Sequence, residues 1–185
     1  MGPVGDRYRP AVLGRVGAER AVGLGLEQVT RLALRAGDVD IAHARGIEAV
    51  NVQERIGYTE GVIAALHLLG RVILATGDGA AASTEHRRAL RMALTIGHVA
   101  AMCEALEDLA QDAAAADQEQ ARSLLQLAEH HRAERSLPRR SHDDTSATTL
   151  RSQLGAADSR CHLDTSLEDA VREVKCRTDK PFGVN

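Results

Sequence analysis

The chain is poor in aromatic residues. Tryptophan is absent from its 185 residues, phenylalanine occurs once and tyrosine twice. The strands of a β-sandwich favour aromatic and β-branched side chains, whereas this core must be filled by Leu, Val, Ile and Ala. Small aliphatic side chains suit the helical state and let helices pack closely. The composition therefore favours helix packed on helix.

Cysteine is also scarce. Cys103, Cys161 and Cys176 are odd in number and show no C-x-x-C spacing, which excludes a disulfide framework as the basis of the fold. We expect Cys103 to pack as a small hydrophobic residue, with a reactive thiol as the alternative.

Strong charge and long apolar runs are missing as well. The formal net charge is −3, so no global basic field exists to attract nucleic acid or anionic lipid. No apolar run approaches the length of a membrane span, and the first residues lack the apolar stretch of a signal peptide. These absences predict a cytoplasmic location, with no direct nucleic-acid partner and no membrane partner.

The strongest positive signal is a Gly-Asp step that recurs with its surroundings. Ala36-Gly37-Asp38 returns as Thr76-Gly77-Asp78, an offset of 40 residues. Apolar positions recur at the same offset, among them Leu34 with Leu74, Ala49 with Ala89, Ile56 with Ile96 and Leu66 with Leu106. A period of this size is typical of helical repeats, in which a helix pair buries its apolar face only by stacking on a neighbour. The sequence therefore predicts an all-α solenoid of about three helical hairpins.

Glycines are expected to end the helices and acids to begin them. Gly37 can adopt the left-handed conformation that ends a helix, and the carboxylate of Asp38 can accept hydrogen bonds from the first amides of the next helix. In the first helix, apolar residues recur at helical spacing, namely Val22, Leu26, Val29, Leu32 and Ala33. Helices are predicted over about 18–36, 38–56, 58–76, 78–96, 98–114 and 117–134, with the register slipping by a residue or more at the last.

Composition divides the chain into five parts. Gly, Pro and Arg in residues 1–17 indicate an irregular lead-in, and residues 18–136 form the repeats. Polar, turn-forming residues after Pro138 indicate a linker over 137–149. Residues 150–176 carry two short helical patterns and would form a helical cap of the kind that open arrays need, followed by a disordered tail over 177–185.

One motif suggests a nucleotide enzyme. The run from Val72 to Ala82 contains G-x-G-x-x-A after an apolar stretch, as in dinucleotide-binding turns. The equivalent segment 40 residues earlier lacks the second glycine, and Asp78 would oppose a phosphate. A helix-turn-helix connection is the simpler interpretation, and G-x-x-x-x-G-K-[ST] is absent.

Metal, hydrolase and nucleic-acid sites have weak support. His131 and Glu134 lie one turn apart, but H-E-x-x-H is absent. Ser141-His142-Asp143 resembles a catalytic triad written consecutively, whereas catalytic triads assemble from separated elements. Four arginines lie near the end of the sixth helix, but acids follow them and aromatic stacking partners are missing, so a solvated helix end is favoured; they are Arg132, Arg135, Arg139 and Arg140. We expect no enzymatic activity, no catalytic residues, no cofactor and no metal.

Several segments resemble a known family. Residues 66–78, Arg88-Ala89-Leu90 and 106–110, followed in the tail by Leu137-Pro138, 150–155 and 167–171, are similar to the tetratricopeptide-like C-terminal region of large LuxR-family and AfsR-like regulators from actinobacteria. The likeness covers roughly residues 20–175. It implies a tetratricopeptide-like fold and a role in signal transduction and transcription regulation. The ATPase region and the DNA-binding helix-turn-helix of that family are absent here, so neither activity is implied.

Polar pairs recur along the first helix of each predicted hairpin. In tetratricopeptide-like arrays this helix lines the concave face, and here six positions follow the period: Glu27 and Arg31, His67 and Arg71, Glu107 and Gln111. We call them the polar ladder. Plain solvation is the simpler explanation of such a stripe, because any amphipathic helix presents polar residues outward. As a functional hypothesis, it would bind a protein or peptide, such as an ATPase or cyclase component of a split regulator.

The expected function is therefore a non-catalytic module for protein interaction or effector sensing. Two alternatives stay open at this stage. One is a small helical enzyme or a protein that binds a metal or nucleotide, and the other is a truncated regulator remnant without a ligand.

Overall fold

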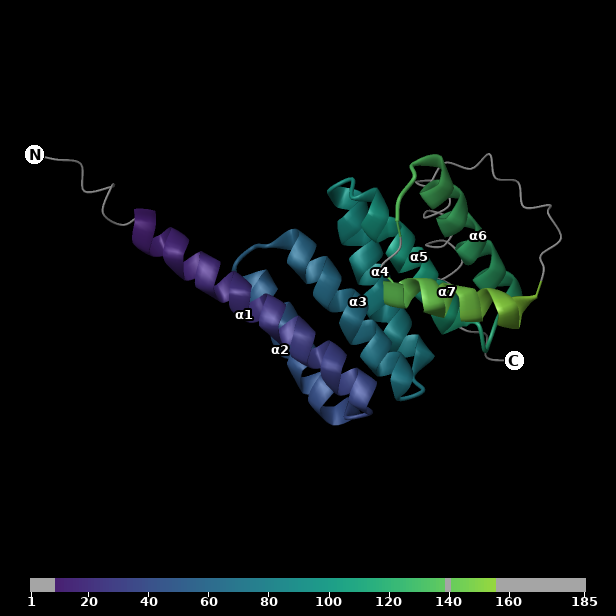
Figure 1. Ribbon diagram of the computed structural model, residues 1–185, viewed down its shortest axis with the longest axis horizontal. Coiled ribbons are helices and arrows are strands. Elements are labelled where there is room, and N and C mark those ends of the chain that lie inside the picture. The colour runs from purple at the N-terminus through teal and green to yellow at the C-terminus, as the bar shows by residue number, and fades with distance from the viewer. Residues whose placement is uncertain (1–8, 139–140, 156–185) are drawn as a thin grey trace, which may run out of the picture. The chain divides into compact units, whose positions relative to one another are not determined.

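All elements of the described chain are helices. The computed structural model describes residues 9–138 and 141–155, with the backbone alone for 9–13, 15 and 141–147, and no strand occurs in these ranges. This confirms the predicted all-α class (Figure 1). The elements in chain order are α1 (Arg9–Ala36), α2 (Val39–Arg55), α3 (Thr59–Ala75), α4 (Gly79–Thr95), α5 (Val99–Ala113), α6 (Gln118–Glu134) and α7 (Ser141–Leu154).

The helices pack in consecutive pairs within two compact units. The first unit, Met1–Ile96, contains the hairpins α1/α2 and α3/α4; α2 also packs on α3, and α1 touches α3. The second unit, Gly97–Asn185, contains the hairpin α5/α6, with α7 packed on α6. The described chain thus holds the three hairpins that the period predicted. It divides after Ile96, within the 18–136 region that the sequence suggested was continuous.

The repeated glycines end the helices as predicted. Gly37 has φ 83° and Gly77 has φ 90°, both in the left-handed region, and Gly57 and Gly97 follow the same pattern. After α1, the Gly37 amide donates to Leu34 O at 3.2 Å and the Asp38 amide to Ala33 O at 2.9 Å. These two bonds form a Schellman motif, which satisfies carbonyls that the end of the helix leaves unpaired.

The acids at the helix starts behave differently from one another. The Asp78 carboxylate accepts from the Ala81 amide at 2.9 Å, and that of Asp117 from the Gln120 amide at 2.9 Å. Asp38 occupies the N-cap position of α2, but its side chain makes no capping hydrogen bond. The predicted capping is therefore confirmed for Asp78 and is wrong for Asp38.

Two predicted irregular segments are helical. Residues 9–17 belong to α1, although their Gly and Pro content suggested a lead-in. Pro10 falls in the first turn, where its missing N–H removes no helical bond. Residues 141–149 belong to α7 rather than to a linker, because polar and acidic residues also favour helix starts. The short helical pattern predicted over 150–154 forms the end of α7, and the helix ends at Gly155 as expected. Residues 1–8, 156–176 and the predicted tail 177–185 lie outside the described residues.

Alanines bring the helices of each hairpin close together. The second helix of every hairpin carries two fully buried alanines seven residues apart: Ala42 and Ala49, Ala82 and Ala89, Ala121 and Ala128. The last pair lies 39 rather than 40 residues after the one before it, so the predicted slip of register at the sixth helix is a single residue. A methyl group at these positions allows close approach without a cavity.

A histidine fills the place of a missing side chain in the second hairpin. His86 of α4 is fully buried, and its Nε2 lies 3.2 Å from the carbonyl oxygen of His67 on α3. A Cβ atom built on Gly70 would lie 2.2 Å from the same Nε2. At the positions equivalent to Gly70 and His86, each of the other hairpins also pairs a larger with a smaller residue. These pairs are Thr30 with Gly46 and Leu125 with Ala110. At this position of each hairpin, a larger side chain on one helix is thus matched by a smaller one on the other helix, and the two helices stay packed.

This matching of sizes predicts a paired effect at Gly70 and His86. We expect Gly70→Ala to lower the free energy of unfolding by about 1–3 kcal/mol through overpacking. The double variant Gly70→Ala/His86→Leu copies the third hairpin and should recover most of that loss. Denaturant unfolding followed by circular dichroism measures both. Gly17→Ala is the control, since an added Cβ there meets nothing within 4 Å. A double variant no more stable than Gly70→Ala would contradict the matching of sizes.

A second prediction concerns the end of α3. Because nothing lies within 4 Å of a Cβ built on Gly77, any cost of substitution there comes from its φ of 90°. Gly77→Val should lower the free energy of unfolding by about 1–2 kcal/mol, and Gly77→Asn by less, because Asn tolerates the left-handed region. Thermal or denaturant unfolding tests the order, and equal losses for Val and Asn would mean that backbone strain is not the cause.

Candidate functional site

Half of the predicted polar ladder is buried. Glu27, His67 and Glu107 are only 5, 5 and 6% exposed, so the expectation that they line an open surface is wrong. The second helix of the hairpin covers this position: Gln53 of α2 donates to Glu27 Oε1 at 3.1 Å, and α6 supplies a partner for Glu107. Since a buried carboxylate is costly unless it is hydrogen-bonded, these groups hold hairpins together.

The remaining ladder residues are half-buried. Arg31, Arg71 and Gln111 lie on α1, α3 and α5 at the predicted positions. Arg31 donates from Nη1 to Gln28 Oε1 on its own helix at 3.1 Å. Their role in partner binding stays a prediction.

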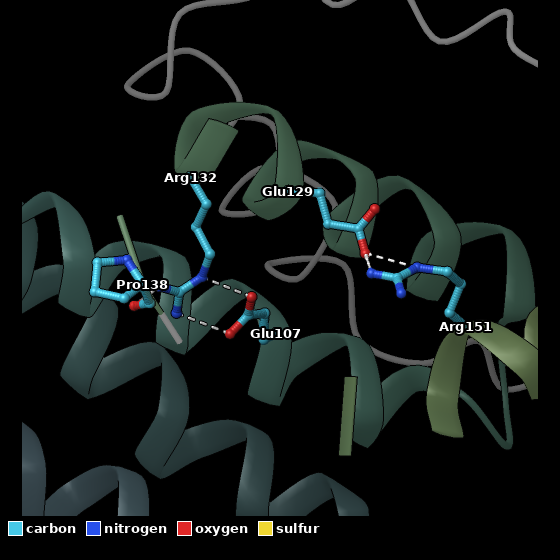
Figure 2. Close-up of polar contacts among 5 residues, drawn as sticks. All are labelled: Glu107, Glu129, Arg132, Pro138 and Arg151. Carbon is cyan, nitrogen blue, oxygen red and sulfur yellow. Dashed lines mark hydrogen bonds and ion pairs between the residues drawn. The ribbon is translucent and has the colours of Figure 1, made fainter. Parts of the chain in front are cut away.

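The most developed polar contact joins α5 to α6. Arg132 donates from Nε and Nη2 to the two carboxylate oxygens of Glu107, at 2.8 and 2.9 Å, and both side chains are buried (Figure 2). A third bond runs from Arg132 Nη1 to the carbonyl oxygen of Pro138 at 3.1 Å. Burial lowers the pKa of Arg132, but the hydrogen bonds and charge of Glu107 outweigh it and raise the pKa above its ordinary value. Arg132 is thus committed to holding the fold. The solvated helix end that the sequence favoured is therefore wrong for this residue, and the alternative of phosphate binding does not apply to it either.

Cys103 lies fully buried on α5. Burial raises the pKa of its thiol, and the charge of Arg132 only partly opposes that shift. A thiol kept protonated is a poor nucleophile. The prediction that Cys103 packs as a small hydrophobic residue is therefore confirmed.

One cluster of the described residues has the chemistry of a metal site. His131 Nδ1 lies 3.1 Å from Glu134 Oε2, and His130 Nε2 lies 3.6 Å from Glu134 Oε1. Two features oppose a metal ion. Arg135 Nη1 is 3.2 Å from the same His131 Nδ1, which places a positive charge beside the ligand atom. The other ring nitrogen of His131 is buried and has no hydrogen-bond acceptor in the described chain, although metal-bound histidines usually donate from that atom.

A small hollow lies between α6 and α7. Its volume is about 200 Å³, and its lining includes Leu125, Gln126, Glu129 and Arg151. Arg151 pairs with Glu129 across it (Figure 2), with Nε at 3.0 Å from the carboxylate. Small-molecule sites usually enclose roughly 300–1,000 Å³. The hollow is below that range. Its second arginine, Arg122, donates from Nε to the carbonyl oxygen of Leu154 at 2.8 Å.

The other sequence motifs do not assemble into a site. Val72–Ala75 belong to helix α3, so the G-x-G-x-x-A run follows a helix rather than the strand that a dinucleotide site requires. Ser141, His142 and Asp143 begin α7, and their side chains lie outside the described part.

The least expected surface is an apolar stripe on α1. Val22, Val29 and Leu32 are 53, 44 and 63% exposed, although their spacing assigned them to an apolar helix face. The equivalent residues of α3, one period later, are Val62, Leu69 and Val72, at 3, 7 and 0%. On α3 this face is packed by the α1/α2 hairpin, and no described helix covers it on α1. The stripe is therefore an apolar face that the helices in the described residues leave uncovered.

A pH effect follows from the burial of His131. Burial lowers the pKa of this side chain from its usual 6.5, more than the hydrogen bond and charge of Glu134 raise it. The unfolded chain then binds more protons just below pH 6.5, so the free energy of unfolding should fall as the pH drops below that value.

His131→Leu should make this pH dependence shallower. Denaturant unfolding at a series of pH values measures it, with the same substitution at the more exposed His130 as control. An unchanged slope in His131→Leu would contradict the assignment.

Comparison with protein-family models, with curated proteins and with solved structures gives no match to this chain. None of the helices in residues 9–138 and 141–155 is both long and apolar enough to span a membrane. The geometry of the described residues is therefore the basis for any functional proposal.

Proposed function

We propose that this chain is a non-catalytic protein-interaction module with a tetratricopeptide-like array of helical hairpins. The support for this array is the 40-residue period together with the packing of consecutive helices. In the first unit, first helices of adjacent hairpins touch, as α1 does with α3. Such arrays present surfaces rather than pockets.

The main support for the proposal is the exposed apolar stripe on α1. Its three large residues, Val22, Val29 and Leu32, are each more than two-fifths exposed. Full burial of one such side chain contributes about 1.5–3 kcal/mol. Covering the exposed half of all three would therefore favour association, although the loss of translational and rotational freedom opposes it. The partner that fits is a helix or helical hairpin with an uncharged apolar face, because that is what covers the equivalent face of α3.

The polar ladder has a smaller part in this proposal. Arg31 lies on the same helix as the stripe, and Arg71 on α3 of the same unit. As charges at the edge of an interface, they would favour partners with acidic flanks and make binding dependent on salt. A role as an effector-sensing part of a LuxR-like regulator is the wider proposal, supported by the motif resemblance of the sequence.

Site-specific photo-crosslinking in cells tests the proposal. A photoreactive amino acid at Val29 should crosslink a discrete protein, and the same group at Asn51, exposed on α2, should not. Leu32→Glu should abolish the product without changing helicity, because it buries a charge in the contact.

Two results would count against the stripe. One is the absence of any crosslink at Val29 beyond the Asn51 control. The other is loss of the crosslink in Arg31→Glu/Arg71→Glu while Leu32→Glu retains it, which would move the contact to the polar ladder.

A further inference from the structure

The exposed stripe of α1 carries no charge. Between Ala18 and Leu32, the central residues of this face are small or aliphatic, and the acidic and basic residues of the same range fall on other sides of the helix. The central residues are Ala18, Ala21, Gly25, Val29 and Leu32, all exposed. Nothing lies within 4 Å of a Cβ built on Gly25. A partner helix can therefore approach closest at Gly25.

These residues lie at equal distances on either side of Gly25, with the small side chains before it and the large ones after it. Seven residues before it is Ala18, and seven after it is Leu32; four before it is Ala21, and four after it is Val29. If a second α1 lies antiparallel with a twofold axis at Gly25, each residue faces its counterpart at the same distance on the other side of Gly25. Leu32 of each copy then faces Ala18 of the other, and Val29 faces Ala21.

This pairing places a large side chain against a small one at each level. Gly25 faces Gly25 at the axis, where two helices need the least bulk. Large-to-small matching is what a close-packed helix interface requires, and a face that matches itself is the mark of an isologous dimer.

A head-to-tail arrangement of copies is disfavoured by α7. In the first unit, Gly46 of α2 lies against Leu69 of the next hairpin. The equivalent residue of α6 is Leu125, which lines the contact with α7, and Leu150 and Leu154 of α7 are buried. The face of α6 that a following hairpin would use is thus occupied. A second copy therefore meets α1 most readily with its own α1.

We propose that two copies of this chain pair through the stripe of α1, antiparallel about a twofold axis at Gly25. The inference deepens the proposed function and rests on it, in that a second copy is named as the helical partner of the stripe.

Cysteine crosslinking tests the position of the axis. In a chain with Cys161→Ser and Cys176→Ser, Gly25→Cys should form an interchain disulfide under mild oxidation, because a residue at a twofold axis meets its own counterpart. Gly17→Cys is the matched control: Gly17 is also an exposed glycine of α1 with nothing within 4 Å of an added Cβ, but it lies off the stripe. A disulfide at residue 17 and none at residue 25 would overturn the arrangement.

Sedimentation over a concentration series tests the contact itself. The unmodified chain should be in monomer–dimer equilibrium. Gly25→Leu should raise the dimer dissociation constant about tenfold or more by separating the helices, whereas Gly17→Leu should leave it unchanged. The sign of the change in the dissociation constant distinguishes the two kinds of contact. Leu adds apolar surface, so it would lower the dissociation constant of an unspecific hydrophobic contact. Circular dichroism checks that both variants stay helical.

The outcomes separate this inference from the proposed function. A chain that is monomeric at every concentration, or a dimer unaffected by Gly25→Leu, overturns the pairing. If Val29 nevertheless crosslinks a different protein or another segment of its own chain, the stripe is an interaction surface with another occupant. If Val29 crosslinks nothing, the interaction module itself is refuted.

Discussion

The close approach of two helices within each hairpin is the constraint on which the structure depends. Fully buried alanines occupy the same two places in the second helix of each hairpin: Ala42 and Ala49, Ala82 and Ala89, Ala121 and Ala128. Interiors are packed as densely as crystals, so a larger side chain there would separate the helices and expose the leucines between them. Where one helix gains bulk, as at His86, the other loses it, as at Gly70.

This geometry also explains why polar residues are buried. Each first helix carries a polar residue at the same position, and the second helix covers it in each hairpin. Gln53 bonds Glu27 in the first, and Arg132 bonds Glu107 in the third. A buried charge without a partner costs far more than a paired one. Removing either partner of such a pair would leave the other buried without compensation, and Arg132 in addition donates to the carbonyl oxygen of Pro138.

The surface that remains available for recognition is an apolar helix face that no described helix covers. At the far side of α6, α7 provides a cover with Leu150 and Leu154. On α1 the corresponding apolar face is open to solvent. An uncharged stripe of this kind is a liability in a protein that does not bind through it, and its absence of charge and graded side-chain sizes fit a helical partner. The functional proposals follow from this asymmetry between a covered face and an uncovered one.

The sequence by itself determined the features that depend on local backbone geometry. Gly37 and Gly77 end helices because glycine takes a positive φ with the least strain, and the 40-residue period follows from helix and turn lengths. It did not determine which side of a helix is covered, because that depends on residues far away in the chain. Val22 and Val62 are the same residue type one period apart, yet one is exposed and the other buried. Glu27 and Glu107 were expected at the surface and are buried because Gln53 and Arg132, on other helices, bind them. Burial and exposure are tertiary properties, and only the packing of the hairpins decided them.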